Sequence, residues 1–310
     1  MVGRELSDRY PSREHNISDK IGLEVNGWTV HHPIYTEKKV VDNVSFNVHR
    51  GEIVGFSGLQ GAGRTELAMS IFGRSYGSDI SGELMIDGKP ANLKTVREAI
   101  EAGLAYVTED RKGNGLILTE SIARNTTMAR LEKVCNKGII DVDKENAVAD
   151  EYKERLRTKT PTVQQSVGNL SGGNQQKVLL SKWMFADPEV LILDEPTRGI
   201  DVGAKYEIYC IMNDLVAQGK SVVMISSEKV FIVLVVVTVA ELISDALAHT
   251  LDGMHQMMLL KKRQRTEYIR FVNGQNLIFQ FRQCHRMNGL GQFPDHDNSI
   301  GCRLNAVLLQ

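Results

Sequence analysis

GLQGAGRT, residues 58–65, stands between an apolar stretch, EIVGFS, and a helical pattern, ELAMSIFG. A strand, a glycine-rich turn and a helix start in this order are the layout of a phosphate-binding loop in an α/β protein. The glycines permit positive φ and let backbone N–H groups approach an anion at the helix start, and the threonine hydroxyl can bind Mg²⁺. The stretch therefore predicts a nucleotide site formed by Gly58, Gly61, Ala62, Gly63, Arg64 and Thr65.

One position in this phosphate loop departs from the usual pattern, because Arg64 stands where a lysine is expected. Arginine keeps the positive charge, but its planar fork is bulkier than an ammonium group and does not act as the same point charge. We therefore expect nucleotide binding at this loop with inefficient chemistry. Taken alone, the loop also fits an ordinary glycine turn without a ligand.

Composition narrows the classes of partner. The chain has 310 residues, enough for one large domain or two ordinary ones, with 37 basic and 38 acidic side chains and a net charge of −1. So balanced a charge predicts no nucleic-acid partner. The four cysteines are scattered without metal or redox spacing, which favours a reducing cytosol. The apolar run Val230–Ala240 is too short to span a membrane, so any membrane role is expected to come through a partner.

The chain divides into three stretches that differ in composition and in hydrophobic pattern. Residues 1–20 are polar and are typical of a linker, and residues 21–228 alternate apolar strands with helical patterns, as α/β domains do. Residues 229–310 lack this alternation and stay unassigned. The strands are predicted at Val44–Val48, Glu52–Ser57, Leu84–Ile86, Gly103–Val107, Val190–Leu193 and Ser221–Ile225, and the helices at Thr65–Phe72, Val96–Glu101, Lys144–Leu156, Asn174–Phe185 and Ala204–Gln218.

A second motif, VLILDEPTRGID at residues 190–201, brings two carboxylates to the end of an apolar strand. Ligands of α/β sheets bind at the carboxyl ends of strands. Asp194 suits an outer-shell carboxylate of Mg²⁺, and Glu195 suits the base that polarises an attacking water. An ordinary strand that ends in a solvated acidic turn is the alternative for this motif alone.

The third motif is the signature segment, LSGGNQQK at residues 170–177. Ser171, Gly172 and Gly173 precede a helix whose apolar face includes Val178 and Trp183, and a helix start of this kind is a second anion site. A generic helix cap is the alternative, but a cap requires only the serine and not the whole octet.

The ordered set of three motifs resembles the ATP-binding subunit of an ABC transporter. More narrowly, GLQGAGRTEL, YVTEDRKGNGL and ISSE resemble the C-terminal half of bacterial monosaccharide importers, in which two ATP-binding domains are fused. The resemblance covers residues 1–228, where MVGREL is similar to the linker between the halves. It implies an α/β P-loop NTPase with a RecA-like core, an antiparallel β subdomain and a helical signature subdomain.

The resemblance also implies roles for single residues. Tyr35 would stack on adenine, with Trp28 as the weaker candidate because an aromatic in an early strand is more often core. Glu109 takes the place of the glutamine that senses the γ-phosphate, and as a carboxylate it would reach Mg²⁺ through water. Ser227 takes the place of the switch histidine but cannot hold a proton as imidazole does. The implied ligands are ATP, contacted across an interface by Ser171, Gly172, Gly173, Asn174 and Gln175, and Mg²⁺, held by Thr65, Glu109 and Asp194.

By the same resemblance, the chain is the energy-coupling subunit of a monosaccharide importer, with a degenerate site of its own that completes the ATP site of a partner. The implied partners are a second nucleotide-binding domain, either a homologous half or another copy, a transmembrane permease and, indirectly, a sugar-binding protein. The implied location is the cytoplasmic face of the cell membrane. A soluble ABC ATPase without a transport role and an inactive fragment are the alternatives.

Residues 229–310 match no part of the family pattern. A shifted reading frame or a truncation is the simplest hypothesis, and disorder is an alternative. The spacing of Cys284, His285, His296 and Cys302 fits no zinc template, and KKRQR at 261–265 is typical of a solvated basic stretch.

Overall fold

The structure is a computed structural model that describes residues 11, 17–58 and 61–227, together with four two-residue strands near the C-terminus. Those strands are β11 (Glu267–Tyr268), β12 (Leu277–Ile278), β13 (Arg282–Gln283) and β14 (Val307–Leu308). The predictions for the linker before residue 17, for the apolar run 230–240, for KKRQR and for the cysteine and histidine cluster lie outside the described residues, Pro11 apart.

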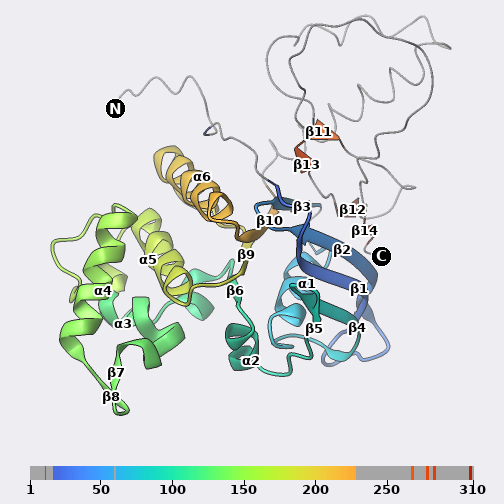
Figure 1. The fold of residues 1–310 in the computed structure, drawn as a ribbon, viewed down its shortest axis with the longest axis horizontal. Coiled ribbons are helices and arrows are strands. Elements are labelled where there is room, and N and C mark those ends of the chain that lie inside the picture. Colours follow the sequence, from blue (N-terminus) through green and yellow to red (C-terminus); the bar gives the residue numbers. More distant parts are fainter. Residues whose placement is uncertain are drawn as a thin grey trace, which may run out of the picture.

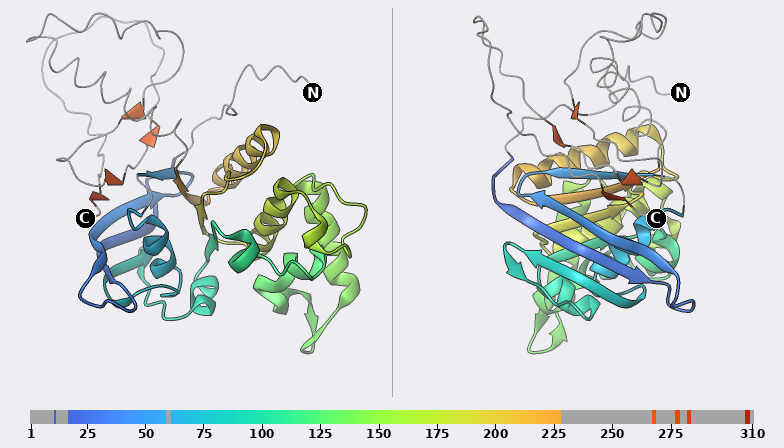
Figure 2. Two further views of the ribbon diagram at one scale, coloured as in Figure 1. Left: turned by 180° about the vertical axis from the view of Figure 1, so that it is seen from behind. Right: turned by 90° about the vertical axis from the view of Figure 1, so that its right-hand side faces the viewer.

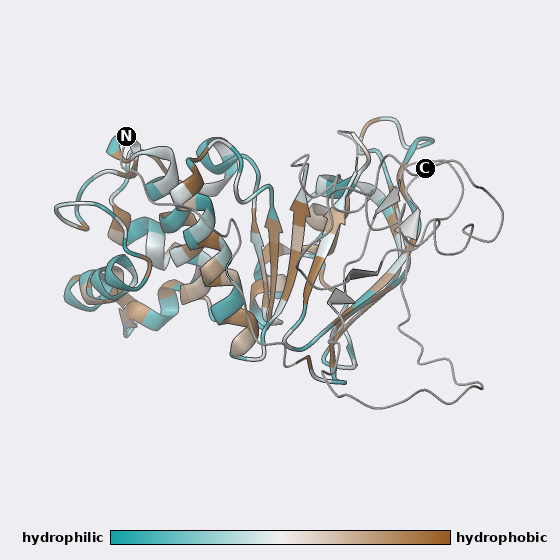
Figure 3. Cartoon of the chain, turned by 90° about the horizontal axis from the view of Figure 1, so that it is seen from above, coloured by the Kyte–Doolittle hydropathy of each residue, from teal (hydrophilic) through white to brown (hydrophobic). Residues whose placement is uncertain are grey.

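A buried parallel sheet forms the centre of the molecule (Figure 1). Its strand order is β3 (Ile53–Ser57), β10 (Ser221–Ser226), β9 (Val190–Asp194) and β6 (Leu104–Val107), and all three pairings are parallel. Every residue of β6, β9 and β10 is buried, which explains why these strands are near-continuous apolar runs instead of alternating patterns. Figure 3 shows the apolar character of this sheet.

An antiparallel sheet lies on one side of the parallel sheet and a group of helices on the other (Figures 1 and 2). Its order is β2 (Lys39–His49), β1 (Ile21–His31), β4 (Ser78–Ile86) and β5 (Lys89–Pro90). The helical group contains α3 (Ile122–Thr127), α4 (Val142–Arg155) and α5 (Gly172–Phe185), with 3₁₀ turns at Met128–Val134 and Val167–Asn169 and a hairpin of β7 (Cys135–Asn136) and β8 (Ile139–Ile140).

Three helices belong to the central part of the fold: α1 (Arg64–Ile71), α2 (Val96–Glu101) and α6 (Val202–Ala217). The predicted strands and helices are all present. The bounds of α2 agree with the prediction, and α4, α5 and α6 each begin two residues earlier than predicted because Asp141, Ser171 and Asp201 occupy their N-cap positions. A π-helical turn at Arg111–Gly115 follows β6.

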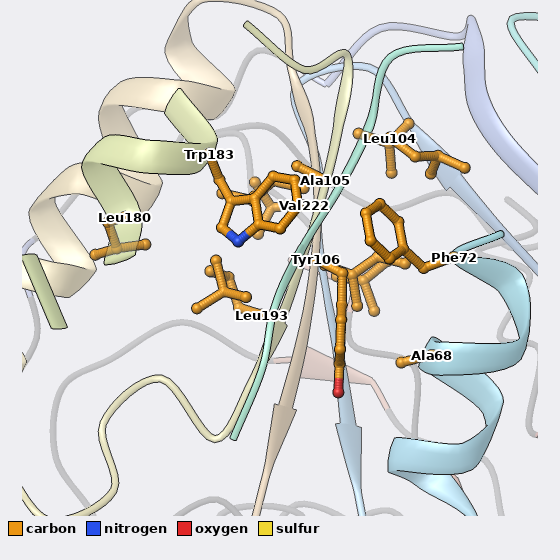
Figure 4. Packing of buried hydrophobic residues seen from close by; sticks show 14 of the residues in the cluster. Ala68, Phe72, Leu104, Ala105, Tyr106, Leu180, Trp183, Leu193 and Val222 are labelled. Carbon is orange, nitrogen blue, oxygen red and sulfur yellow. The ribbon is translucent and has the colours of Figure 1, made fainter. Parts of the chain in front are cut away.

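Aromatic packing fixes the helical group to the sheet (Figure 4). The ring of Trp183 from α5 packs edge-on against that of Phe72, with the ring centroids 5.4 Å apart. The centroid of Phe72 also lies 5.8 Å from that of Tyr106 in β6. Trp28 of β1 is buried and donates a hydrogen bond of 2.9 Å to the Ser70 hydroxyl. Trp28 is therefore a core residue.

In the described part of the chain, no helix is both long and apolar enough to cross a bilayer.

Candidate nucleotide site

The end of the phosphate loop has the backbone that glycine permits. Gly61 and Gly63 have φ of +83° and +75°, in the left-handed region that other residues enter at a cost. A Cβ at Gly61 would meet nothing within 4 Å, so the loop is open at this point. Gly63 is the N-cap of α1 and lies beside the buried Ala62, and Gly58 is half-buried where β3 ends. Open backbone before a helix start is the arrangement that accepts phosphate.

The side chain of Arg64 points into the protein. It is buried, and its Nη1 donates a hydrogen bond of 3.0 Å to the carbonyl oxygen of Ser226 at the end of β10. Burial raises the pKa of the Asp194 and Glu195 carboxyl groups. The nearby Arg64 guanidinium opposes this rise but does not cancel it. The side chain expected to contact phosphate is thus a guanidinium bound to the carboxyl end of β10.

Asp194 ends β9 and is fully buried. Its Oδ2 accepts a hydrogen bond of 2.9 Å from Tyr106 on the neighbouring strand, whereas its Oδ1 has no partner among the described residues. Burial raises the pKa of Asp194, and hydrogen bonding from Thr65 and Tyr106 opposes that rise. A buried carboxylate oxygen without a donor, close to a threonine hydroxyl, fits a cation-binding role.

Glu195 follows directly and has an unusual backbone. Its φ is +47°, which is strained for a residue with a side chain, and its N–H donates to the Ile225 carbonyl at 3.0 Å. Burial raises the pKa of the Glu195 carboxyl, with hydrogen bonding from Ser227 acting in the opposite direction. Strain and a raised pKa at the end of a strand are properties of functional carboxylates.

A cavity of about 310 Å³ collects several of the predicted residues. Glu109 and Arg198 form an ion pair there, and the Arg198 backbone carbonyl accepts a hydrogen bond of 3.3 Å from Arg111 Nη1. Thus Glu109, the expected γ-phosphate sensor, is held by a cation from the loop 196–200. The lining residues are Glu109, Glu195, Thr197, Arg198, Gly199, Lys205 and Ser227.

The signature segment places its first turn at the surface. Ser171 is exposed and has an extended backbone conformation. Gly172 is half-buried, and a Cβ at this position would lie 2.7 Å from Arg111 Nη2. Gly173 is buried, and a Cβ there would approach the Ala204 methyl of α6 to 3.0 Å. The two glycines therefore allow the start of α5 to lie against α6 and Arg111.

The last two predicted contacts of this segment face the chain itself. Asn174 bonds to Ser171 and to the backbone of Lys159. Gln175 is buried, and its Nε2 donates to the carbonyls of Val167 and Leu170 at 3.3 and 3.2 Å. Tyr35, by contrast, is 60% exposed in the turn between β1 and β2, and its ring centroid lies 5.2 Å from that of His32. It is open to stacking.

The structure adds three residues to which the sequence analysis assigns no role: Tyr106, Arg111 and Arg198. Tyr106 reaches Asp194 only because β6 and β9 are neighbours in the sheet, a pairing that no local pattern reveals. Arg111 and Arg198 both lie inside motifs, but their contacts join segments 87 positions apart. No group of three or more histidine, cysteine, aspartate or glutamate side chains forms a metal-binding cluster within the described ranges.

The parallel sheet, the glycine loop before α1 and the acidic end of β9 define a nucleotide-binding cassette of the P-loop class. Among solved structures, a dimeric bacterial ABC transporter cassette matches with a TM-score of 0.57 at 21% identity, over 66% of this chain and 88% of that one. A nucleotide-free ATP-binding cassette from an ABC transporter matches with a TM-score of 0.56 at 21% identity, over 69% of this chain and 84% of that one. At this identity the likeness shows the fold alone.

The model of the ABC transporter family matches residues 41–198, and the chain belongs to this family. It is 58% identical over 228 residues to the L-arabinose transport ATP-binding protein AraG of Geobacillus stearothermophilus, covering 74% of this chain and 44% of the relative. A xylose import ATP-binding protein of Thermoanaerobacter pseudethanolicus is 49% identical over 74% of this chain and 45% of its own length. The chain thus spans less than half the length of these relatives.

Proposed function

We propose that the chain is the ATP-binding, energy-coupling part of an ABC importer for monosaccharides. Relatives named for arabinose, xylose and ribose import support the substrate class. The proposed partners are a second nucleotide-binding domain, a transmembrane permease and, through it, a sugar-binding protein. The chain would then work at the cytoplasmic face of the membrane, where nucleotide binding drives the permease.

The observation that carries the finer part of this proposal is an asymmetry between the two anion-binding segments. The Arg64 guanidinium is buried against the Ser226 carbonyl, whereas Ser171 lies exposed at the start of α5. ABC sites are composite, with the phosphate loop of one domain facing the signature segment of the other. We infer that this chain binds ATP weakly at its own loop and completes the ATP site of its partner.

The residues of the chain's own site fit ATP and Mg²⁺ to a limited extent. The open backbone at Gly61 and the positive φ of Gly63 suit phosphate, and the Thr65 hydroxyl beside the Asp194 carboxyl, whose Oδ1 has no partner among the described residues, suits the cation. When bound, Mg²⁺ would neutralise charge on the phosphate oxygens. Tyr35 would contact adenine from its exposed turn.

The remaining residues of this site are not matched to rapid hydrolysis. Glu195 would orient and deprotonate an attacking water, but burial raises its pKa and Ser227 cannot take up a proton as a histidine does. Glu109 would have to leave Arg198 before it could serve the cation. We therefore expect slow turnover at this loop.

The test compares ATP hydrolysis by the purified chain alone with hydrolysis after the remaining half of the arabinose relative is added. We expect little hydrolysis alone and clear hydrolysis in the mixture. Glu195→Gln in this chain should alter the mixture little, whereas Ser171→Ala should lower its rate. A rate typical of transporter ATPases from the chain alone would contradict the degenerate site, and an inactive mixture would contradict the composite one. Recovery with a co-expressed arabinose permease in the membrane fraction checks the transport role.

A further inference from the structure

Asn174 makes two hydrogen bonds that together determine which way its amide faces. Its Oδ1 accepts the backbone N–H of Lys159 at 3.0 Å, and its Nδ2 lies 3.0 Å from the Ser171 hydroxyl oxygen. A backbone N–H can only donate, so the amide oxygen must face Lys159 and the amide nitrogen must face Ser171. The assignment of the two amide atoms is therefore set by the chain itself.

This orientation fixes the role of the serine hydroxyl. Because the Asn174 amide nitrogen donates to Ser171 Oγ, the hydroxyl oxygen accepts from that side and cannot direct its own proton there. Ser171 is exposed, and no acceptor for its proton lies within the described residues. The hydroxyl is thus arranged as a donor toward the outside.

The neighbouring backbone groups have the same polarity. Ser171 is the N-cap of α5, but its side chain does not cap the backbone N–H groups of the first turn. The N–H groups of Gly172 and Gly173 have no acceptor within the described ranges, as is usual for a first turn without a cap. The hydroxyl proton and these N–H groups thus place several donors side by side at the start of α5.

We propose that Asn174 is a positioning residue that holds the Ser171 hydroxyl as a donor toward an ionised terminal phosphate. This inference rests on the proposed function, in which the partner's phosphate loop supplies that phosphate. A phosphate with all terminal oxygens ionised presents only acceptors, and charged acceptors form the stronger hydrogen bonds with such donors. In this proposal Asn174 acts through the serine, in place of the direct ATP contact that the family resemblance implies.

Asn174→Asp reverses the polarity with almost no change in shape. One carboxylate oxygen still accepts the Lys159 N–H, but the other can no longer donate, so the Ser171 proton turns inward to meet it. In the wild-type chain, Ser171→Ala should lower the kcat of the mixture with the remaining half of the arabinose relative by roughly ten-fold or more, the loss expected for a hydrogen bond to a charged group. In the Asn174→Asp background, the same alanine change should cost less than about two-fold, because the hydroxyl no longer reaches the phosphate.

This comparison separates polarity from charge, since both Asn174→Asp chains carry the same extra carboxylate. Equal melting temperatures of the four chains exclude a loss through unfolding. If Ser171→Ala costs the same factor in both backgrounds, Asn174 does not act through the serine and the inference is overturned.

A second measurement needs neither nucleotide nor partner. In the NMR spectrum of the isolated chain, Ser171→Ala should shift the side-chain NH₂ signal of Asn174 and leave the backbone N–H signal of Lys159 in place. The matched control is the side-chain NH₂ of Asn125, which bonds only to backbone carbonyls of Ile117, Glu120 and Ser121 and should not move. An unmoved Asn174 signal overturns the inference even if the mixture is active. A shifted signal beside an inactive mixture upholds the Asn174–Ser171 bond and refutes the composite site.

Discussion

Arg64 and Ser226, which lie 162 positions apart, are joined by a hydrogen bond of 3.0 Å from the guanidinium Nη1 to the backbone carbonyl. The bond connects the start of α1 to the end of β10, one residue before Ser227, which lines the cavity. A lysine ammonium on a single flexible stem would be able to turn toward the loop. The planar fork instead remains with the sheet, and this difference is the physical basis of the expected weak binding.

Arg64→Lys should tighten ATP binding by the isolated chain by about ten-fold, the effect of one hydrogen bond to a charged group. The same change should lower the free energy of unfolding by about 1 kcal/mol, because the bond to the Ser226 carbonyl is lost. Titration with a fluorescent ATP analogue and urea unfolding measure the two effects. Arg64→Met is the matched control, with the same loss of stability and no tightening. Loss of all binding in Arg64→Lys would mean that the loop holds phosphate in another way.

Glu195→Gln should stabilise the folded chain at neutral pH. Burial raises the pKa of Glu195 in the folded state, so the folded chain binds more protons than the unfolded one above the ordinary carboxyl pKa. Stability from this group is therefore lost as pH rises from about 4 through the folded pKa. The gain from glutamine should be larger at pH 7 than at pH 4, as measured by urea unfolding at both values. An equal gain in stability at pH 7 and pH 4 would mean that the effect does not come from the titration of Glu195.

The amino-acid sequence predicts the strands of the parallel sheet well because burial on both faces makes them continuous apolar runs. It does not reveal β1, whose pattern is broken by register shifts around Gly27, a residue with φ of +59°. The short helix α3, IARNTT, is equally hidden, because β-branched and polar residues favour no helix until α4 and α5 pack against it.

The candidate site likewise has features that the sequence predicts and features that it does not. Motif order predicts which residues gather, since strand ends and helix starts have fixed positions around a parallel sheet. The direction of a long or amide side chain depends on partners far away in the chain. Arg64 turns to a carbonyl of β10, Glu109 pairs with Arg198, and Asn174 is oriented by the backbone of Lys159. None of these contacts has a local signal.

A cluster of charges at the end of the parallel sheet opposite the candidate site should make the stability of the folded chain fall at acid pH. Arg50 donates to Asp87 and Glu189, and its side chain is only 12% exposed. Burial raises the pKa of both carboxyl groups, but hydrogen bonds from Arg50 at Asp87, and from Lys220 and Arg50 at Glu189, outweigh it and leave both pKa values lowered. Their contribution is present above the ordinary carboxyl pKa and is lost as pH falls through the folded values.

Arg50→Met should therefore cost about 1–3 kcal/mol of unfolding free energy at pH 7, between the values for exposed and buried ion pairs. The difference from the wild-type chain should shrink below about pH 4. Urea unfolding over this range measures it, with Arg97→Met at an exposed ion pair as the control expected to change little. A cost that persists unchanged in acid would point to lost packing of the arginine stem.

The buried Lys182 of α5 should also make stability rise with pH, but in the alkaline range. Its Nζ donates to the Gly115 carbonyl at 2.5 Å, and burial lowers the pKa of this lysine to about 8. Between about pH 8 and the ordinary lysine pKa, the unfolded chain binds more protons, so stability from this group rises with pH. Relative to Lys182→Met, the wild-type chain should gain stability between pH 7.5 and 9.5 in urea unfolding. A difference independent of pH would mean that Lys182 titrates normally.

Gly172→Asp tests the role of the signature segment in the partner's site. A Cβ at this position lies 2.7 Å from Arg111 Nη2, so the new carboxylate would pair with that guanidinium and fill the space before the first turn of α5. Because like charges repel, the partner's triphosphate would be excluded, and ATP hydrolysis by the mixture should fall at least ten-fold. Affinity of the chain's own Arg64 loop should stay within about two-fold, since that loop faces the other signature segment. Asn136→Asp, an equal charge on the exposed β7–β8 hairpin, should change neither quantity. Full hydrolysis in the Gly172→Asp mixture would defeat the composite site, whereas loss of affinity in the isolated chain together with a lowered melting temperature would show that the helix start had unfolded.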